Sequence, residues 1–174
     1  MSRQEVMEIF VGLGSNQGRV EDNLAAAVRE LSELDGVKGS RISSLYYTEP
    51  QGVKDQPWFG NQVVRLECDS RLWSPQALLD RLLGIEAEMG RVRCRPWGER
   101  IIDLDLLFFG QRELASKELV LPHPRIRERA FVLVPLLEIA PDKRMPDGKR
   151  LADCLERLSY RVRGNTICQA DSRR

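Results

Sequence analysis

The sequence predicts a mixed α+β fold with a mainly antiparallel central sheet. Four stretches are short runs of apolar, β-branched and aromatic residues, which is typical of strands. Two further segments repeat apolar residues at spacings of three and four, which is typical of helices that bury one face. Glycine, proline and polar clusters separate these stretches, so they are distinct elements joined by turns and loops.

The first half of the chain contains a regular series of elements. Residues 8–13 predict a strand, and Gly14 to Gly18 predict a turn, in which Gly14-Ser15-Asn16 is typical of a tight turn with a helix cap. A helix is expected from about residue 20 to residue 34, where apolar residues recur at helical spacing. Residues 42–47 predict the second strand and residues 61–67 the third.

The second helix begins at Ser74-Pro75, an N-cap followed by proline at the first helical position, and ends near Met89. Its apolar face is predicted to contain Leu78, Leu79, Leu82 and Leu83. Glu86 continues this face, and a buried carboxylate needs partners. Backbone amides or arginines are the favoured partners, and a direct catalytic part is the alternative.

Residues 101–109 are almost continuously apolar and lie between Gly98 and Gly110. This pattern predicts a strand that is covered on both faces and is therefore central in its sheet. The order strand-helix-strand-strand-helix-strand is the signature of a ferredoxin-like α/β sandwich, here with C-terminal additions.

The remainder of the chain is less regular. A short apolar run at residues 119–121 precedes a helix from about Arg127 to Ile139, which Pro135 must kink or restart. Residues 151–158 predict a last short helix, and residues 161–174 a polar tail with little to pack.

Length and composition indicate one globular domain. The 174 residues are 42% hydrophobic and 30% charged, and we expect a single domain over the whole chain with its core at about residues 8–160. The net charge of +1 gives no reason to expect a nucleic-acid partner. Four scattered cysteines indicate neither a zinc site nor a disulfide framework. The N-terminus does not resemble a signal peptide and no apolar run has membrane-spanning length, so we expect a cytoplasmic protein.

Two aspartates interrupt the apolar run at residues 101–109. Side chains alternate along a strand, so Asp103 and Asp105 share one face, and the opposite face is expected to contain Ile102, Leu104, Leu106 and Phe108. Two carboxylates on one face can hold one or two hard cations, and Mg²⁺ prefers few carboxylates together with waters and phosphates. The alternative is a strand end whose aspartates pair with arginines.

Four arginines closely precede the aspartates: Arg91, Arg93, Arg95 and Arg100. They form a local basic patch in a nearly neutral chain, and an acidic pair beside an arginine cluster suggests a metal with a polyphosphate. The common phosphate-binding motifs are missing, since there is no G-x-x-x-x-G-K-[ST] and no H-R-D loop. The third glycine of Gly12 to Gly18 is one residue late for a dinucleotide motif.

Two long loops and one histidine are further candidates. The punctuated stretch at residues 48–57 is too long for a simple connection and is expected to be functional. His123 lies between two prolines, so a rigid, exposed imidazole could contact a phosphate, donate a proton, or only close a turn. Trp58, Phe59 and Trp97 lie in loops near the arginines, where they stack on a flat ring or attach the loops to the core.

Taken in order over about residues 8–150, the motifs resemble those of the 6-hydroxymethyl-7,8-dihydropterin pyrophosphokinases of folate biosynthesis. The resemblance depends on these segments: Gly14-Ser15-Asn16, Thr48 to Asn61 with Asp55-Gln56-Pro57, Gly90-Arg91-Val92-Arg93, Trp97-Gly98-x-Arg100-x-x-Asp103-Leu104-Asp105, Pro122-His123-Pro124 and Arg129-x-Phe131.

The resemblance implies transfer of the pyrophosphoryl group of ATP, the co-substrate, to the pterin hydroxymethyl oxygen by in-line attack at the β-phosphorus. AMP is released and two Mg²⁺ ions assist, held by Asp103 and Asp105. It assigns catalytic parts to Arg91, Arg93, Asp103 and Asp105. The expected partners are these small molecules, with no nucleic acid and no membrane, and the expected state is a monomer.

The resemblance also implies two sets of contacts. ATP is expected to contact Glu86, Arg91, Arg93, Trp97, Arg100, Ile101, His123 and Arg129. The pterin is expected to contact Thr48, Pro50, Phe59, Asn61, Trp97 and Phe131, with Phe59 and Phe131 on either side of its ring.

The chain departs from the family pattern at several positions. The loop from Arg93 to Trp97 is one residue shorter, with Pro96 where a basic residue is common. Phe59 replaces a frequent tyrosine, Gln51 a frequent leucine and Pro124 a frequent aromatic residue.

Two rival functions use the same features. One is a non-catalytic module that binds a nucleotide or metal, and the other is an ordinary kinase or a metal-dependent phosphohydrolase. We also expect the loops at residues 48–60 and 90–99 to close over ATP, because they are rich in glycine, proline and charge.

Overall fold

The computed structural model describes residues 6–92 and 96–170. One twisted sheet runs through the molecule, and its neighbouring strands follow the order β5-β1-β4-β3-β9-β8, with β2 beside β4. The strands are β1 (Val6–Ser15), β2 (Val37–Ile42), β3 (Tyr46–Thr48), β4 (Phe59–Asp69), β5 (Asp103–Phe109), β8 (Tyr160–Arg163) and β9 (Thr166–Gln169). Among the described residues only β3 and β9 pair in parallel, so the predicted α+β fold with a mainly antiparallel sheet is confirmed.

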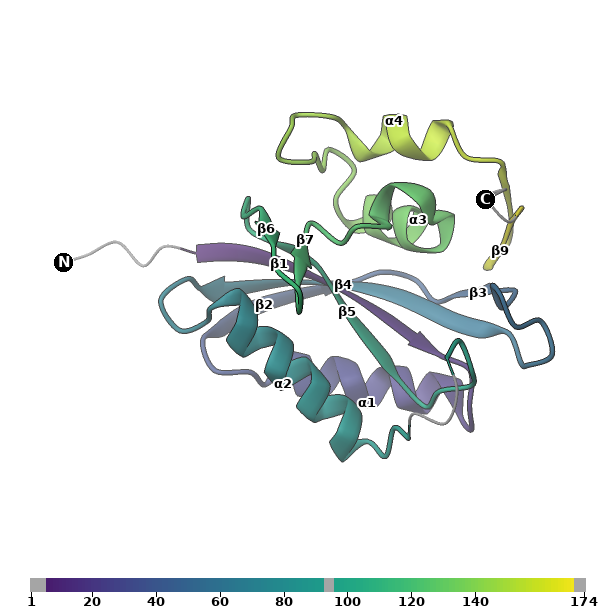
Figure 1. Cartoon of the computed structure of the whole chain (residues 1–174), viewed down its shortest axis with the longest axis horizontal. Helices are drawn as coiled ribbons and strands as arrows, with labels where there is room; N and C mark the ends of the chain where they lie inside the picture. The colour runs from purple at the N-terminus through teal and green to yellow at the C-terminus, as the bar shows by residue number, and fades with distance from the viewer. Residues whose placement is uncertain (1–5, 93–95, 171–174) are drawn as a thin grey trace.

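Helices cover both faces of the sheet. Figure 1 shows α1 and α2 on one face and α3 and α4 on the other. Their bounds are α1 (Val20–Ser32), α2 (Pro75–Glu88), α3 (Ala130–Ile139) and α4 (Leu151–Glu156). A short 3-10 helix, Ile126–Glu128, precedes α3, and β6 (Leu114–Ala115) and β7 (Val120–Leu121) form a separate hairpin.

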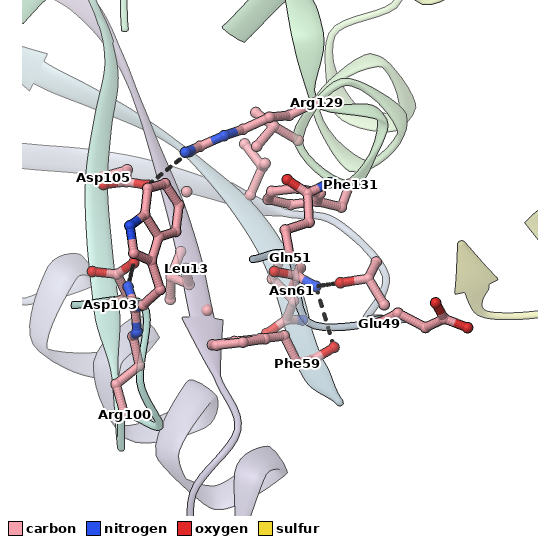
Figure 2. Close-up of a pocket in the computed structure, with 17 residues that line it drawn as sticks. Leu13, Glu49, Gln51, Phe59, Asn61, Arg100, Asp103, Asp105, Arg129 and Phe131 are labelled. Carbon is pink, nitrogen blue, oxygen red and sulfur yellow. Dashed lines mark hydrogen bonds and ion pairs between the residues drawn. The ribbon is translucent and has the colours of Figure 1, made fainter. Parts of the chain in front are cut away.

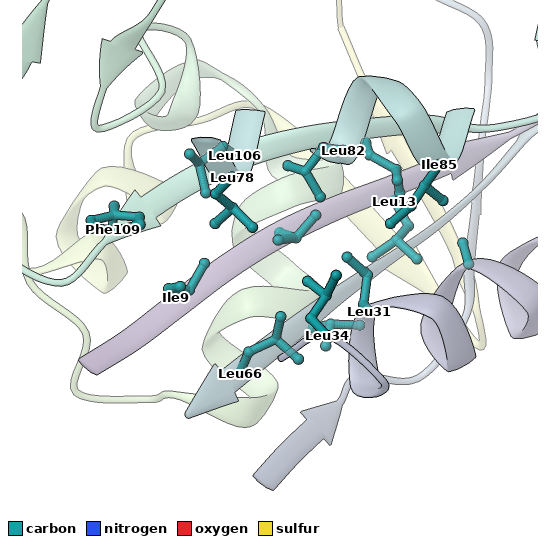
Figure 3. Packing of buried hydrophobic residues seen from close by; sticks show 14 of the residues in the cluster. Ile9, Leu13, Leu31, Leu34, Leu66, Leu78, Leu82, Ile85, Leu106 and Phe109 are labelled. Atoms are coloured by element: carbon teal, nitrogen blue, oxygen red, sulfur yellow. The ribbon is translucent and has the colours of Figure 1, made fainter. Parts of the chain in front are cut away.

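The core has two parts because β-strand side chains alternate between faces. Ile9, Val11 and Leu13 of β1 pack against the leucines of α1 and α2, as Figure 3 shows for the first cluster. Phe10 points to the other face, where it joins Leu133 and Leu136 of α3. The sheet is therefore a buried middle layer that holds the residues at its end in fixed positions.

The predicted helices are confirmed in their positions. The Ser74 side chain accepts a hydrogen bond from the Ala77 backbone N–H at 3.1 Å and caps α2. One detail of the apolar face is wrong, because Leu83 is exposed and Ile85 is fully buried instead. Pro135 lies inside α3, which continues from Ala130 to Ile139 without a restart.

The predicted second strand is wrong as a single element. The sequence 42–47 is shared between the end of β2 and the start of β3. At Ser43 the side-chain hydroxyl accepts from the Val63 N–H at 2.9 Å, in the place that a backbone carbonyl has in a regular ladder. This local hydrogen bond interrupts the pairing with β4.

Strand β5 lies at the edge of the sheet, not in its centre as predicted. Within the part of the chain that the structure describes, β5 pairs with β1 alone, while α2 and the second core cluster cover its faces. The segment after β7 covers part of its free edge, since the His123 N–H donates to the Leu107 carbonyl at 3.0 Å. Because β5 is buried on both faces, it has the apolar composition that is typical of a central strand, although it lies at the edge.

The alternation along β5 holds only as far as Leu106. The pairing register with β1 shifts between Phe10 and Val11. Phe108 is consequently in the second cluster, packed edge-on against Phe10 with 5.9 Å between ring centroids, and it does not share the face of Leu104 and Leu106 as predicted.

The predicted polar tail is wrong for the residues that the structure describes. β8 and β9 form an antiparallel hairpin over residues 160–169, and β9 extends the main sheet beside β3. Ile167 is buried and provides the packing that the sequence pattern had not indicated.

Candidate active site

Two rows of residues cross strands β4, β1 and β5 at one end of the sheet. The register places Asn61, Gly14 and Asp103 in one row. Val63, Gly12 and Asp105 form the next. The two glycines leave an open floor between the aspartates and Asn61. The predicted turn over Gly14 to Gly18 begins too early, because Gly14 and Ser15 belong to β1 and the chain bends at Gln17 and Gly18.

Asp103 is held by two arginines. Its Oδ1 lies 2.6 Å from Arg91 Nη1, and its Oδ2 lies 2.7 Å from Arg100 Nη1. Arg91 is only 10% exposed, so this ion pair is largely shielded from water. The predicted alternative, that the aspartates pair with arginines, is thus present in the structure and leaves the carboxylate in place for a cation.

Asp105 has a weaker partner. Arg129 Nη1 lies 3.7 Å from its Oδ2, beyond hydrogen-bonding distance (Figure 2). Burial and the negative charge of Asp103 raise the pKa of Asp105 to about 6. Burial and the Asp103 charge disfavour the ionised form of Asp105. A cation bound nearby would favour that ionised form, because opposite charges attract.

Arg129 also has unused hydrogen-bonding capacity. Its Nε is buried and has no hydrogen-bond partner within residues 6–92 and 96–170. Its guanidinium lies 5.6 Å from the centroid of the Phe131 ring. Burial lowers the pKa of Arg129, although the side chain stays charged at neutral pH.

Glu86 has the structural partners that were favoured from the sequence. Its Oε1 accepts from the Leu104 N–H at 2.7 Å and lies 2.6 Å from Arg91 Nη1. The carboxylate thereby joins α2 to β5 and orients Arg91 toward Asp103.

Asn61 presents an acceptor to the pocket floor. Its Nδ2 donates to Thr48 Oγ1 at 2.9 Å and to the Phe59 carbonyl at 3.2 Å (Figure 2). A carbonyl accepts only, so the amide orientation is fixed and Oδ1 remains for a ligand N–H. Gly14 faces this oxygen, since a Cβ added there would lie 3.6 Å from it.

Two pockets meet at the aspartates. The narrower one, of about 100 Å³, lies between the rings of Phe59 and Phe131 in Figure 2 and includes Asn61 and Gln51. The wider one, of about 640 Å³, is bounded by α2, the loop before β5 and His123. The residues common to both linings are Trp97, Arg100, Asp103, Asp105 and Arg129.

His123 is partly buried, not exposed as predicted. Its Nδ1 accepts from the Arg125 N–H at 3.1 Å, so the ring proton of the neutral form is on Nε2. Burial and the positive charges of Arg129 and Arg125 lower the pKa of His123 to about 4. At neutral pH it is an uncharged hydrogen-bond donor in the wall of the wider pocket.

The identity of this fold and site follows from comparison with known proteins. Residues 10–141 match the model of the 7,8-dihydro-6-hydroxymethylpterin-pyrophosphokinase (HPPK) family, which is more than half of the chain. The chain belongs to the HPPK family. The matched segment contains every described residue of the two pockets that is named above.

Two curated relatives are named 2-amino-4-hydroxy-6-hydroxymethyldihydropteridine pyrophosphokinase. The protein from Methylorubrum extorquens is 47% identical over 149 residues, which are 86% of this chain and 92% of the relative. That from Pseudomonas aeruginosa is 42% identical over 150 residues, 86% of this chain and 91% of the relative.

The fold is shared with solved HPPK structures. The crystal structure of Plasmodium falciparum HPPK-DHPS with pteroate has a TM-score of 0.69 and 14% sequence identity. The match covers 96% of this chain and 48% of that one, so this chain spans about half the length of the Plasmodium protein.

Most predicted HPPK site residues come together around the two pockets, but Pro50, Ile101 and Arg93 need comment, as does the candidate loop aromatic Trp58. Pro50 is buried, and its neighbours Glu49 and Gln51 line the narrower pocket instead. Ile101 packs against the main core cluster and lines neither pocket. Trp58 is exposed and also lines neither. Arg93 lies outside the described residues.

Sequence reasoning missed the role of Asn16, which is only 2% exposed. Its Nδ2 donates to Gln56 Oε1 and to the Pro57 carbonyl, both at 3.0 Å. Its Oδ1 accepts from the Arg100 N–H at 2.9 Å. Gln56 in turn donates to the Trp97 carbonyl at 2.8 Å. Asn16 therefore joins the loop before β4 to the loop before β5, and we call these two segments the site loops. It does not cap α1 as predicted.

The donor set fits Mg²⁺. Within the two described ranges, no cluster of three or more histidine, cysteine, aspartate or glutamate side chains is placed to bind a metal. Asp103 and Asp105 are the two carboxylates that line both pockets. Mg²⁺ commonly binds one or two carboxylates and completes its shell with water and substrate phosphates, so a pair suffices.

Proposed function

We propose that this chain transfers the pyrophosphoryl group of ATP to the hydroxymethyl oxygen of 6-hydroxymethyl-7,8-dihydropterin, releasing AMP, as a step of folate biosynthesis. The observation that carries the proposal is the meeting of two pockets of different character at Asp103 and Asp105. A reaction between two bound substrates needs such a junction, where the reacting atoms are held together.

The narrower pocket suits a flat heterocycle with N–H donors. Phe59 and Phe131 provide ring faces on its two sides, and Asn61 provides an acceptor whose orientation is fixed by Thr48 and Phe59. A ring without a hydrogen-bond donor would leave the Asn61 oxygen unsatisfied, which costs affinity. These features support assignment of the pterin to this pocket.

The wider pocket suits a nucleotide with a polyphosphate. Arg91, Arg100 and Arg129 line it, and His123 adds a neutral donor. The Nε of Arg129 is buried and has no hydrogen-bond partner among residues 6–92 and 96–170, so the guanidinium keeps donor capacity that a bound anion could use. We therefore assign ATP to this pocket, with its phosphates directed toward the aspartates.

Asp103 and Asp105 would hold Mg²⁺, two ions in our proposal. When bound, Mg²⁺ neutralises phosphate charge and aligns the polyphosphate. In the structure Arg91 and Arg100 neutralise Asp103. A cation on the aspartate would release both guanidinium groups for phosphate oxygens, so the site exchanges one set of ion pairs for another without adding net buried charge.

The chain's own residues then act mainly by position and charge. Arg91, directed by Glu86, and Arg129 would bind phosphate oxygens. Arg100 would do so from the junction of the pockets, where its guanidinium lies 5.5 Å from the centroid of the Phe59 ring. Fixed donors at developing charge are a major source of transition-state stabilisation.

The test is a product assay with ATP, Mg²⁺ and the pterin, run beside a control without pterin. We expect AMP only with pterin present and in step with a pyrophosphorylated pterin. ADP would indicate an ordinary kinase, orthophosphate a phosphohydrolase, and ATP binding without turnover a regulatory module.

Isosteric variants connect the assay to the site. Asp105→Asn keeps the shape but removes the charge, so we expect kcat to fall by ~10²-fold or more with the fold retained. Asp153→Asn, an exposed aspartate of α4, is the matched control and should retain wild-type turnover. Equal rates in both variants would contradict the assignment of Asp105.

A further inference from the structure

The beginning of α3 supplies two site residues and lacks a cap of its own. Arg129 is the N-cap residue and its side chain makes no capping hydrogen bond. Phe131 is the second residue of the helix. The first N–H groups of a helix have no partner within it and need an acceptor from elsewhere.

Gln169 of β9 provides that acceptor from 39 residues further along the chain. Its Oε1 accepts from the Ala130 N–H at 2.7 Å, and its Nε2 donates to the Glu128 carbonyl at 2.6 Å. The two bonded groups are the backbone neighbours of Arg129 on either side. One partner only donates and the other only accepts, so the orientation of the Gln169 amide is fixed.

The hairpin that contains Gln169 pairs with β3, whose Thr48 lines the narrower pocket. β9 pairs in parallel with β3, where Tyr47 is opposite Thr166 and Thr48 is opposite Ile167. The Tyr47 N–H donates to the Asn165 carbonyl at 2.7 Å. Thr48 in turn accepts the hydrogen bond that orients Asn61.

We propose that Gln169 is a positioning residue for Arg129 and Phe131. Its two hydrogen bonds hold the backbone on both sides of Arg129, so that the guanidinium faces Asp105 and the Phe131 ring remains at the wall of the narrower pocket. This inference rests on the proposed function of that site. Gln169 lies outside the segment that matches the HPPK model, residues 10–141.

The direct test measures the local backbone without any substrate. Gln169→Met has a similar length and makes neither hydrogen bond. We expect amide hydrogen exchange at residues 128–133 to rise by about ten-fold or more, while α1 and α2 exchange as in the wild type. Cys168→Ala changes the exposed neighbour on the same strand and should leave exchange unchanged.

The second readout is functional. We expect Gln169→Met to raise both the pterin and the ATP KM, for a loss of about ten-fold in kcat/KM, with a smaller effect on kcat. Affinity for a non-hydrolysable ATP analogue with Mg²⁺ should fall similarly. Gln169→Glu keeps the acceptor for Ala130 but places a second acceptor against the Glu128 carbonyl, so an intermediate loss is expected.

The outcomes are separable. Faster exchange at residues 128–133 with unchanged KM and analogue affinity would make Gln169 a merely structural cap and overturn the proposal, as would unchanged exchange in Gln169→Met. Failure of the wild type to form AMP would refute the proposed function. The exchange and analogue-binding results would then still decide whether Gln169 positions Arg129.

Discussion

Gly14 leaves space in the narrower pocket because it has no side chain. It lies between Asn61 and Asp103 in the strand register, and an added Cβ would be 3.6 Å from Asn61 Oδ1 and 3.9 Å from the Phe59 ring. Alanine fits at this distance. A larger side chain would extend into the pocket itself.

We predict that Gly14→Val raises the pterin KM by about ten-fold or more, because its methyl groups occupy the pocket between Phe59 and Phe131. Gly14 does not line the wider pocket, so affinity for an ATP analogue should be unchanged. Steady-state kinetics and analogue titration measure the two effects. Gly14→Ala is the control, and equal losses for both substrates would show that the valine distorts the whole site.

His123 gives a pH-dependent contribution to stability. Because its folded pKa is about 4 and its unfolded pKa is about 6.5, the unfolded chain binds the proton more tightly. The contribution is present above about pH 6.5 and is lost as the pH falls toward 4. Arg125 and Arg129 increase this effect and Asp103 opposes it.

We therefore predict that His123→Gln reduces the loss of unfolding free energy between pH 7 and pH 4.5 by about 2 kcal/mol relative to the wild type. Urea unfolding at the two pH values measures the difference. Asp105 acts in the opposite direction, since its raised pKa favours the folded state at low pH. Both proteins contain it, so its contribution largely cancels in the comparison. Parallel pH profiles would contradict the prediction.

At the scale of elements, Asn16 connects β1 to two loops that are distant in the sequence. Its amide bonds Gln56 and Pro57 in one loop and Arg100 in the other. Trp97, in the second loop, has a φ of +61°, a conformation that non-glycine residues adopt only when surrounding contacts hold it. The hydrogen bond from Gln56 to its carbonyl is such a contact.

We predict that Asn16→Ala lowers the free energy of unfolding by roughly 2–3 kcal/mol, because three part-buried groups lose their hydrogen bonds to Asn16. Hydrogen exchange at residues 50–58 and 96–100 should rise, and kcat/KM should fall. Asn23→Ala, a variant of a more exposed asparagine that bonds Ser15 and Gln17, is the control. A similar loss in both variants would mean that Asn16 has no special part in holding the loops.

The elements themselves were predictable to different degrees. The helices α1 and α2 follow from apolar spacing and from the Ser74-Pro75 cap, which are local signals. The break at Ser43 and the register shift between β1 and β5 depend on a neighbouring strand, so local sequence does not specify them. The sequence of residues 160–169 has the composition of a polar tail, because the hairpin is stabilised by pairing with β3 and not by an apolar pattern of its own.

At the scale of the whole molecule, the two site loops should respond together to the nucleotide. We predict that a non-hydrolysable ATP analogue with Mg²⁺ lowers hydrogen exchange at residues 48–57 and 96–100, because Asn16 and Gln56 couple them. Exchange in α1 and α4 provides the internal control. Unchanged exchange in both loops would contradict their predicted closure over ATP.

No helix among residues 6–92 and 96–170 has both the length and the apolar character needed to cross a membrane. The cytoplasmic location, the monomeric state and the single domain stay predictions.

The α+β class, the helices and the candidate residues for both substrates could be predicted from the sequence alone. These follow from spacing within a helix or strand and from the ordered motifs, which are properties of short segments. Asp103 and Asp105 on one face of a strand are the clearest case.

The folded arrangement brings these residues together with others that local patterns did not indicate. The structure shows which of them are neighbours. It placed Gly14 between Asn61 and Asp103, gave Asn16 its partners in two loops, and brought Gln169 to the start of α3. It also put β5 at the sheet edge. Each of these depends on strand order, register or a hydrogen bond between distant segments, and such contacts form only when the whole chain folds.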